Sequence, residues 1–141
     1  MKALNCQVYS ELLKVMMTRV KMNQLMKQWM GLSLAAQDSL EKSLIELVKL
    51  RASIVNGCAN CINMHSIEAR AAGETEQRLH LLAAWPEAPV YTPRERAALA
   101  WTDALTRLSA GHTQHSAKDG LEAHFTAEEQ VKLTLMINII N

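Results

Sequence analysis

Two cysteines and a histidine stand close together in segment 56–65, which reads NGCANCINMH. If a helix begins near Cys58, then at about 100° per residue Cys61 lies about 60° from Cys58 around the helix axis, and His65 lies about 20° from it. The three side chains would therefore share one narrow face. Cys61 and His65 are also four residues apart, the spacing that brings side chains on successive turns together.

These residue types support thiol redox chemistry. A thiol reacts as a nucleophile only as its thiolate, and the positive end of a helix dipole favours the thiolate in the first turn. The imidazole of His65 can accept or relay the proton of Cys61 near neutral pH. The thiol of Cys58, one turn away, can then condense with an oxidised Cys61 to form a disulfide. The spacing predicts a two-thiol redox centre that has its own base.

Two other interpretations of the same residues stay open. Cys58, Cys61 and His65 could hold zinc, but a closed structural site needs a fourth ligand. The sequence offers Cys6, His80, His112 and His115, none of them at a typical ligand spacing. The two cysteines could also be inert and buried beside a core histidine. A c-type haem is disfavoured, because Ile62 and not a histidine directly follows the second cysteine.

The sequence around this centre has a helical pattern. Glycine and proline are scarce and stand at joints, β-branched runs are short, and no Asn-Gly turn separates alternating segments. We expect an all-α fold, a compact bundle of about six helices, with the Cys-x-x-Cys motif at a helix N-terminus. The expected helices span 7–30, 38–56, 58–72, 75–85 and 93–110, with a last helix from 127 onward and a loop or short turn at 112–120.

Capping signals mark the ends of these helices. The sequence TPRE at 92–95 combines a capping box with proline at the first helical position, and TAEE at 126–129 is a second capping box. Asp38 or Ser39 is expected to cap the helix that follows. Left-handed C-caps are expected at the glycines that end helical segments, Gly31, Gly57, Gly73 and Gly111.

Length and composition limit the classes of function. The 141 residues suit one domain, and we expect a single domain over 1–141. A net charge of +1 gives no electrostatic reason to expect nucleic acid or an anionic membrane as partner. The longest apolar runs hold five residues, 81–85 and 97–101, whereas a membrane-spanning helix needs about 20. Three cysteines do not suit a secreted disulfide scaffold, and the N-terminus lacks the apolar stretch of a secretory signal, so we expect a soluble, cytoplasmic protein.

The segment 131–140 is apolar on several sides of a helix. A helix of that kind is buried. It packs either against another copy of the chain or into the core of its own monomer, and the sequence leaves both arrangements open.

An ordered series of motifs runs from about Leu40 to Leu108. It comprises ELVKLRAS at 46–53, NGC at 56–58 with Cys61 and His65, Ala69-Arg70, Gly73-Glu74, Trp85 and TPRERAAL at 92–99. The series resembles the alkyl hydroperoxidase D-like group of the carboxymuconolactone decarboxylase superfamily. The resemblance implies an all-helical fold, assembly as a homo-oligomer (a trimer or hexamer), and thiol chemistry that uses no cofactor and no metal.

The resemblance also implies a reaction and a site. Glu46 lies twelve residues before Cys58, the position of a family glutamate that, through water, forms a proton relay with the histidine, here His65. Cys61 would attack the peroxide and become a sulfenic acid, and Cys58 would donate a proton and resolve it as a disulfide. The implied protein is a thiol-dependent alkyl hydroperoxide reductase. It would act on organic hydroperoxides or hydrogen peroxide and be reduced by a thiol or dithiol donor.

The surroundings of Glu46 give independent support for part of this site. Its neighbours in the sequence are apolar, namely Leu44, Leu47, Val48 and Leu50. A buried carboxylate is uncommon unless it is paired or functional. The alternative is a surface glutamate that pairs with Lys42 or Lys49. Ser53, seven residues further on, would share the face of Glu46 and either orients the relay or is a small packing residue.

Asn60 departs from the family pattern. Some peroxidase members have a histidine immediately before the second cysteine, where this chain has Asn60. The alternative function is therefore a Cys-x-x-Cys disulfide reductase or redox relay that serves a partner protein and has weak peroxidase activity. Members that decarboxylate lactones lack the cysteine pair, so we do not expect decarboxylase activity.

Overall fold

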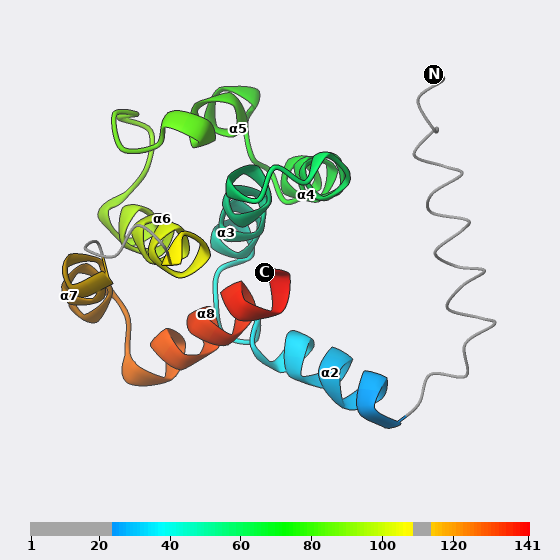
Figure 1. The fold of residues 1–141 in the computed structure, drawn as a ribbon. Coiled ribbons are helices and arrows are strands. Elements are labelled where there is room, and N and C mark those ends of the chain that lie inside the picture. Colours follow the sequence, from blue (N-terminus) through cyan, green and yellow to red (C-terminus); the bar gives the residue numbers. More distant parts are fainter. Residues whose placement is uncertain (1–23, 109–113) are drawn as a thin grey trace, which may run out of the picture. The chain divides into compact units, whose positions relative to one another are not determined.

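The part of the chain that the computed structural model describes, residues 24–108 and 114–141, is helical and contains no strand. This confirms the all-α expectation. None of the described helices is long and apolar enough to span a membrane. The elements are α2 (Gln24–Ala35), α3 (Lys42–Val55), α4 (Ala59–Ala71), α5 (Glu76–Leu81), the 3₁₀ helix η1 (Leu82–Ala84), α6 (Pro93–Thr106), α7 (Gln114–His124) and α8 (Ala127–Ile140) (Figure 1).

The chain divides into two compact units, residues 1–34 and 35–141. The described part of the first unit is α2, which runs through Gly31 without a break. The expected helix end at Gly31 is therefore wrong, because Gly31 does not adopt the left-handed conformation of a C-cap glycine. Inside a helix, glycine lowers stability without ending the helix. The candidate C-cap Gly111 lies outside the described residues. That the chain is a single domain stays a prediction.

Helix α3 is the central element of the second unit. All but one of the residues from Leu44 to Ser53 are buried, so α3 is enclosed on most sides. Figure 1 shows it beside α4 and α6, and it also contacts α8. One side of α3 joins a core with α6, α7 and α8, made of Leu44, Ile45, Val48, Ala98, Leu121, Leu133, Met136 and Ile137. The other side joins a core with α4, α5 and η1, made of Leu47, Leu50, Ala69, Leu79, Leu82, Trp85 and Leu99.

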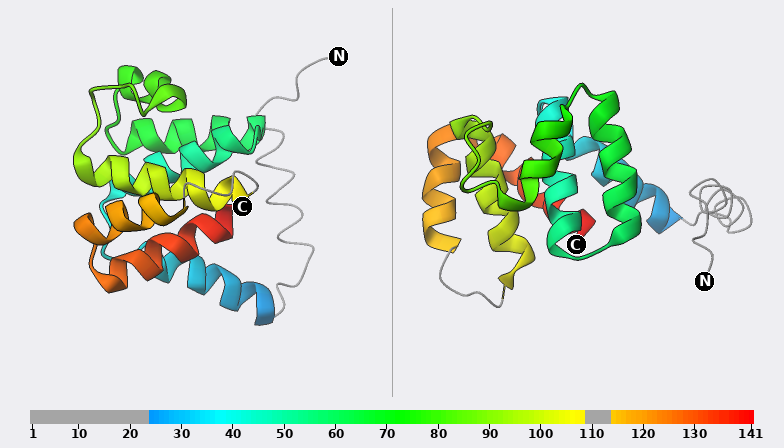
Figure 2. Two further views of the ribbon diagram at one scale, coloured as in Figure 1. Left: turned by 60° about the vertical axis from the view of Figure 1, so that its left-hand side comes forward. Right: turned by 90° about the horizontal axis from the view of Figure 1, so that it is seen from above.

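Two capping boxes fix the starts of α6 and α8, as the sequence predicts. At α6 the Thr92 hydroxyl accepts from the Glu95 amide at 3.2 Å, and the Glu95 carboxylate accepts from the Thr92 amide at 2.8 Å. Thr126 and Glu129 repeat the arrangement at α8. Each box satisfies two backbone donors that a helix start otherwise leaves open. The two further views in Figure 2 keep α6 beside both α3 and α7, which it contacts.

The predicted start of α3 is wrong. Ser39 has a φ of 66° and cannot serve as an N-cap, which needs an extended backbone. Its hydroxyl accepts instead from the Lys132 ammonium at 2.9 Å. The extended residue before α3 is Glu41, whose side chain makes no capping bond and pairs with Arg94. Helix α3 therefore begins after an N-cap residue whose side chain accepts no hydrogen bond from the first turn.

The expected loop at 112–120 is also wrong, because α7 covers Gln114–His124. Its buried residues Ala117 and Leu121, with Phe125 just beyond, recur every fourth position and pack into the core. The segment has few apolar residues, and most of its other residues are polar, so its sequence alone did not indicate a helix. Helix α8 buries Leu133 and Ile137 in the core of its own unit, while its apolar residue Val131 is 59% exposed. The segment therefore packs into the core of its own chain, and contact with another copy stays a prediction.

Candidate redox site

The short connection between α3 and α4 determines the position of the cysteine pair. Gly57 has a φ of 65°, its amide donates to the Ile54 carbonyl at 3.1 Å, and the Cys58 amide donates to the Ser53 carbonyl at 3.1 Å. These two bonds form a Schellman motif, which requires a left-handed residue that glycine adopts at little cost. The end of α3 thus fixes where Cys58 begins the next helix, and the expected C-cap at Gly57 is confirmed.

Cys58 is the N-cap of α4. Its sulfur accepts from the Cys61 amide at 3.3 Å, while its own backbone is extended. Cys58 and Cys61 are joined as a disulfide with their Cα atoms 5.3 Å apart, and both residues are half-buried. The start of α4 thus directs one backbone amide at the Cys58 sulfur. The positive end of the helix dipole favours negative charge in this first turn when the disulfide is reduced.

His65 lies one turn after Cys61 on α4, and its ring is buried. At four residues' spacing the two side chains are neighbours on one face of the helix. The Nδ1 atom of His65 lies 2.8 Å from the Oε2 atom of Glu68, whose side chain is 46% exposed. Sequence reasoning missed Glu68, although its spacing of three residues from His65 is a signal that could have found it.

Glu46 faces inward from α3 and is only 6% exposed. Its Oε1 atom accepts a hydrogen bond from the Lys49 ammonium at 3.2 Å. Its Oε2 atom is buried and has no hydrogen-bond partner in the structure. Both sequence expectations for Glu46 therefore hold in part, because the residue is buried and also pairs with Lys49. An unpaired buried carboxylate oxygen is costly and is typical of functional positions.

Donor atoms of Glu46, His65 and Glu68 lie within 4.8 Å of one another. The fold thus brings the predicted relay pair, Glu46 and His65, together from two helices. The same three donors could hold a divalent cation if they closed by about an ångström or two. This set differs from the zinc set considered from sequence, which relied on the cysteines. Lys49, with its ammonium against Glu46, opposes a cation at this place.

The two supporting residues have different surroundings. Ser53 is buried, and its hydroxyl donates to the Lys49 carbonyl at 2.8 Å within α3. Its backbone carbonyl receives the Cys58 amide, so Ser53 contacts the cysteine joint through its main chain. Asn60 lies in the first turn of α4 with an exposed side chain. A part for either side chain in the reaction stays a prediction.

Of the other candidate zinc ligands, the two that the structure describes, His80 and His115, lie on exposed helix surfaces. His80 on α5 is 77% exposed, as expected for a helix-surface residue. His115 is exposed on α7, a helix rather than the expected loop. Cys6 and His112 lie outside the described residues.

Comparison with known proteins agrees with the fold. Residues 23–104 match the carboxymuconolactone decarboxylase family, CMD. An uncharacterized protein of Bacillus subtilis (strain 168), YdfG, is 41% identical over 105 residues, which cover 74% of this chain and 71% of the relative. The crystal structure of a protein of unknown function from Agrobacterium tumefaciens, described as a candidate antioxidant defence protein AhpD, matches with a TM-score of 0.76 and 45% identity and covers 83% of this chain and 81% of that chain.

The family match spans more than half of the chain, and the solved structure shares its helical fold. The Cys-x-x-Cys pair, at disulfide distance at a helix start, is the feature that the resemblance predicts. The chain therefore belongs to the carboxymuconolactone decarboxylase family, within its alkyl hydroperoxidase D-like group.

Proposed function

We propose that the protein is a thiol-dependent peroxidase that reduces organic hydroperoxides or hydrogen peroxide through Cys61, with Cys58 as the resolving cysteine. The observation that supports this most is the disulfide-linked pair at the start of α4, backed by the buried side chains of Glu46 and His65. The description of the Agrobacterium tumefaciens protein as a candidate antioxidant defence protein points the same way.

The proposed cycle has three balanced steps. The Cys61 thiolate attacks the distal peroxide oxygen, the O–O bond breaks, and with one proton the products are an alcohol (or water) and a Cys61 sulfenic acid. The Cys58 thiol then attacks the Cys61 sulfur and releases water, which leaves the disulfide. An external thiol or dithiol donates two electrons and two protons to restore both thiols. The structure holds the pair in the oxidised state that ends the second step.

Glu46 and His65 are the proposed proton relay. They approach each other from α3 and α4, and both are shielded from bulk solvent. A buried carboxylate and imidazole can move a proton between the thiol and the departing alkoxide without releasing it to water. Lys49 holds one oxygen of Glu46 and leaves the other toward the interior.

Reduction of a partner protein's disulfide is the second candidate function. Met64 and Ile67 on α4 are 42% and 53% exposed, close in sequence to the redox pair. Exposed apolar side chains of this kind suit a docked polypeptide better than a small peroxide. The exposed amide of Asn60, where some peroxidases have a histidine, adds no further base.

Parallel rate measurements separate the two functions. Peroxide reduction and protein-disulfide reduction are followed with one dithiol donor, in a Cys6→Ser background that removes the third thiol. The peroxidase proposal expects peroxide turnover to exceed disulfide exchange and to disappear in Cys61→Ser. Retained peroxide turnover in Cys61→Ser contradicts it, and fast disulfide exchange with slow peroxide turnover favours the second function.

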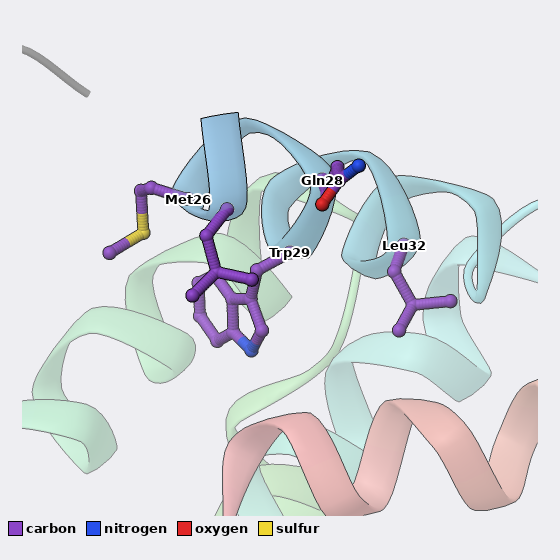
Figure 3. A pocket seen from close by; sticks show the side chains of 5 residues that line it. Met26, Gln28, Trp29 and Leu32 are labelled. Atoms are coloured by element: carbon purple, nitrogen blue, oxygen red, sulfur yellow. The ribbon is translucent and has the colours of Figure 1, made fainter. Parts of the chain in front are cut away.

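We also propose that the protein works as a homo-oligomer in the cytoplasm, as the family resemblance implies. Helix α2 exposes apolar side chains that line one hollow, among them Trp29 and Leu32 (Figure 3). Exposed apolar faces of this kind are commonly covered by a partner, here a second copy of the chain. Light scattering after size exclusion should give the mass of three or six chains, and the mass of one 15.7 kDa chain contradicts the proposal.

A further inference from the structure

The His65 ring has an unequal environment at its two nitrogens. Nδ1 lies 2.8 Å from Oε2 of Glu68, three residues further along α4. An ionised carboxylate can only accept a hydrogen bond, so the shared hydrogen belongs to Nδ1. The neutral ring then has its lone pair on Nε2. Since the ring is 10% exposed and the Glu68 side chain 46%, a half-exposed carboxylate orients a buried base.

We propose that Glu68 is a positioning residue that holds His65 in the Nδ1–H tautomer, so that Nε2 accepts the thiol proton of Cys61. The inference rests on the proposed peroxidase function. A carboxylate on the far nitrogen of a histidine base fixes its tautomer and orientation and stabilises the imidazolium that forms. Around α4, Glu68 lies about 20° from Cys61, so both residues and His65 follow one strip of the helix.

The two carboxylates beside His65 are suited to different tasks. Glu68 comes from the same helix as His65 and is bonded to Nδ1. Glu46 comes from α3, is buried, and presents an oxygen that no other group binds in the structure. With Nδ1 occupied by Glu68, the proton that His65 exchanges with Cys61 and Glu46 passes through Nε2. Glu68 thus fixes the tautomer of the His65 ring, and Glu46 takes part in the proton transfer.

Long-range ¹H–¹⁵N correlation spectra of the reduced protein read the tautomer directly. We expect the Nδ1–H form of His65 in the wild type. In Glu68→Ala the Nε2–H form should become the major one, because nothing then retains the hydrogen on Nδ1. Glu68→Gln should keep the Nδ1–H form, because its amide oxygen can accept the same bond. An unchanged tautomer in Glu68→Ala overturns the proposal.

Peroxide kinetics supply the second readout. We expect kcat of Glu68→Ala to fall about tenfold with KM changed less than about twofold, and Glu68→Gln to recover most of that loss. The melting temperature should barely move, because a half-exposed pair adds little stability. Glu76→Gln is the matched control: Glu76 pairs with Arg70 on the surface and should leave both readouts at wild-type values.

Each kinetic assay is run both with and without a metal chelator, because the donor atoms of Glu46, His65 and Glu68 could also bind a cation. If the kinetic defect of Glu68→Ala vanishes in chelator, Glu68 acts as a metal ligand and the proposal is wrong. If the wild type reduces no peroxide, the proposed function is wrong. The tautomer spectra then still decide whether Glu68 holds His65 in the Nδ1–H tautomer.

Discussion

Arg51 on α3 and Asp103 on α6 form a two-pronged ion pair, with Nε to Oδ1 at 2.6 Å and Nη2 to Oδ2 at 2.7 Å. The Arg51 side chain is 5% exposed, and its remaining nitrogen donates to the Leu82 and Ala83 carbonyls of η1. Arg51 therefore joins α6 and η1 to α3, the helix that bears Glu46. Fork-shaped guanidinium–carboxylate pairs of this kind are short and geometrically specific.

Asp103→Asn should destabilise the protein by about 3 kcal/mol, because it leaves a buried guanidinium without its counter-charge. Trp85 also donates to Asp103, at 3.2 Å, so tryptophan fluorescence can report unfolding in urea. The exposed Arg70–Glu76 pair is the control, and Arg70→Gln should cause no measurable change. A loss for Asp103→Asn as small as that of the control contradicts the assignment.

Substitution of Gly57 should lower the stability of the fold because of the backbone conformation of this residue, and not because a side chain would clash with its surroundings. An added Cβ at Gly57 would meet no atom within 4 Å, yet its φ of 65° disfavours other residues. Gly57→Ala should cost about 1–2 kcal/mol, and Gly57→Asn less, because asparagine tolerates this conformation better. Urea denaturation measures both. Equal losses for the two variants would show that the left-handed turn is not the cause.

Cys58 should have a capping effect separate from its redox chemistry. Its sulfur accepts from the Cys61 amide, a bond that a serine hydroxyl can replace and an alanine cannot. Under reducing conditions, Cys58→Ala should be less stable than Cys58→Ser by about 1 kcal/mol. Both variants lack the resolving thiol, so the comparison isolates the cap. Equal stability of the two variants argues against it.

Glu129 gives a pH-dependent contribution to stability. Hydrogen bonds from Arg94 and from the Thr126 amide lower its pKa from 4.5 to about 2. A lowered folded-state pKa stabilises the fold above the ordinary value and loses that effect as pH falls toward about 2. Glu129→Gln should therefore cost about 1–2 kcal/mol at neutral pH. The cost should shrink as pH falls below about 5.

Urea denaturation of the wild type and Glu129→Gln across this pH range measures the difference. Glu128→Gln is the matched control, since Glu128 is the neighbouring carboxylate, 74% exposed, and pairs with Lys132. A cost for Glu129→Gln that stays constant with pH contradicts the assigned pKa shift.

The sequence predicted the elements whose ends have strong local chemistry. The capping boxes at Thr92 and Thr126 and the left-handed Gly57 and Gly73 are confirmed. The start of α3 was wrong, because Ser39 is held by Lys132, a partner 93 residues away that no local pattern reveals. Helix α7 was missed because its few apolar residues gain meaning only from the core that they join.

The candidate site was predicted to a similar degree. The cysteine pair followed from spacing and the burial of Glu46 from its apolar neighbours, and the structure agrees. Spacing placed His65 on the face of the cysteines, and the structure adds that its ring is buried. Glu68 was missed because an exposed glutamate on a helix is ordinary in sequence. It gains significance only from the distance between its carboxylate and the ring of His65.

Peptide mass mapping after one equivalent of peroxide, with free thiols blocked at once, shows which cysteine reacts with the peroxide. We expect a Cys58–Cys61 disulfide in the wild type, a sulfenic acid on Cys61 in Cys58→Ser, and no oxidation of Cys58 in Cys61→Ser on the same time scale. A sulfenic acid on Cys58 in Cys61→Ser, formed as fast as that on Cys61 in Cys58→Ser, would contradict this expectation.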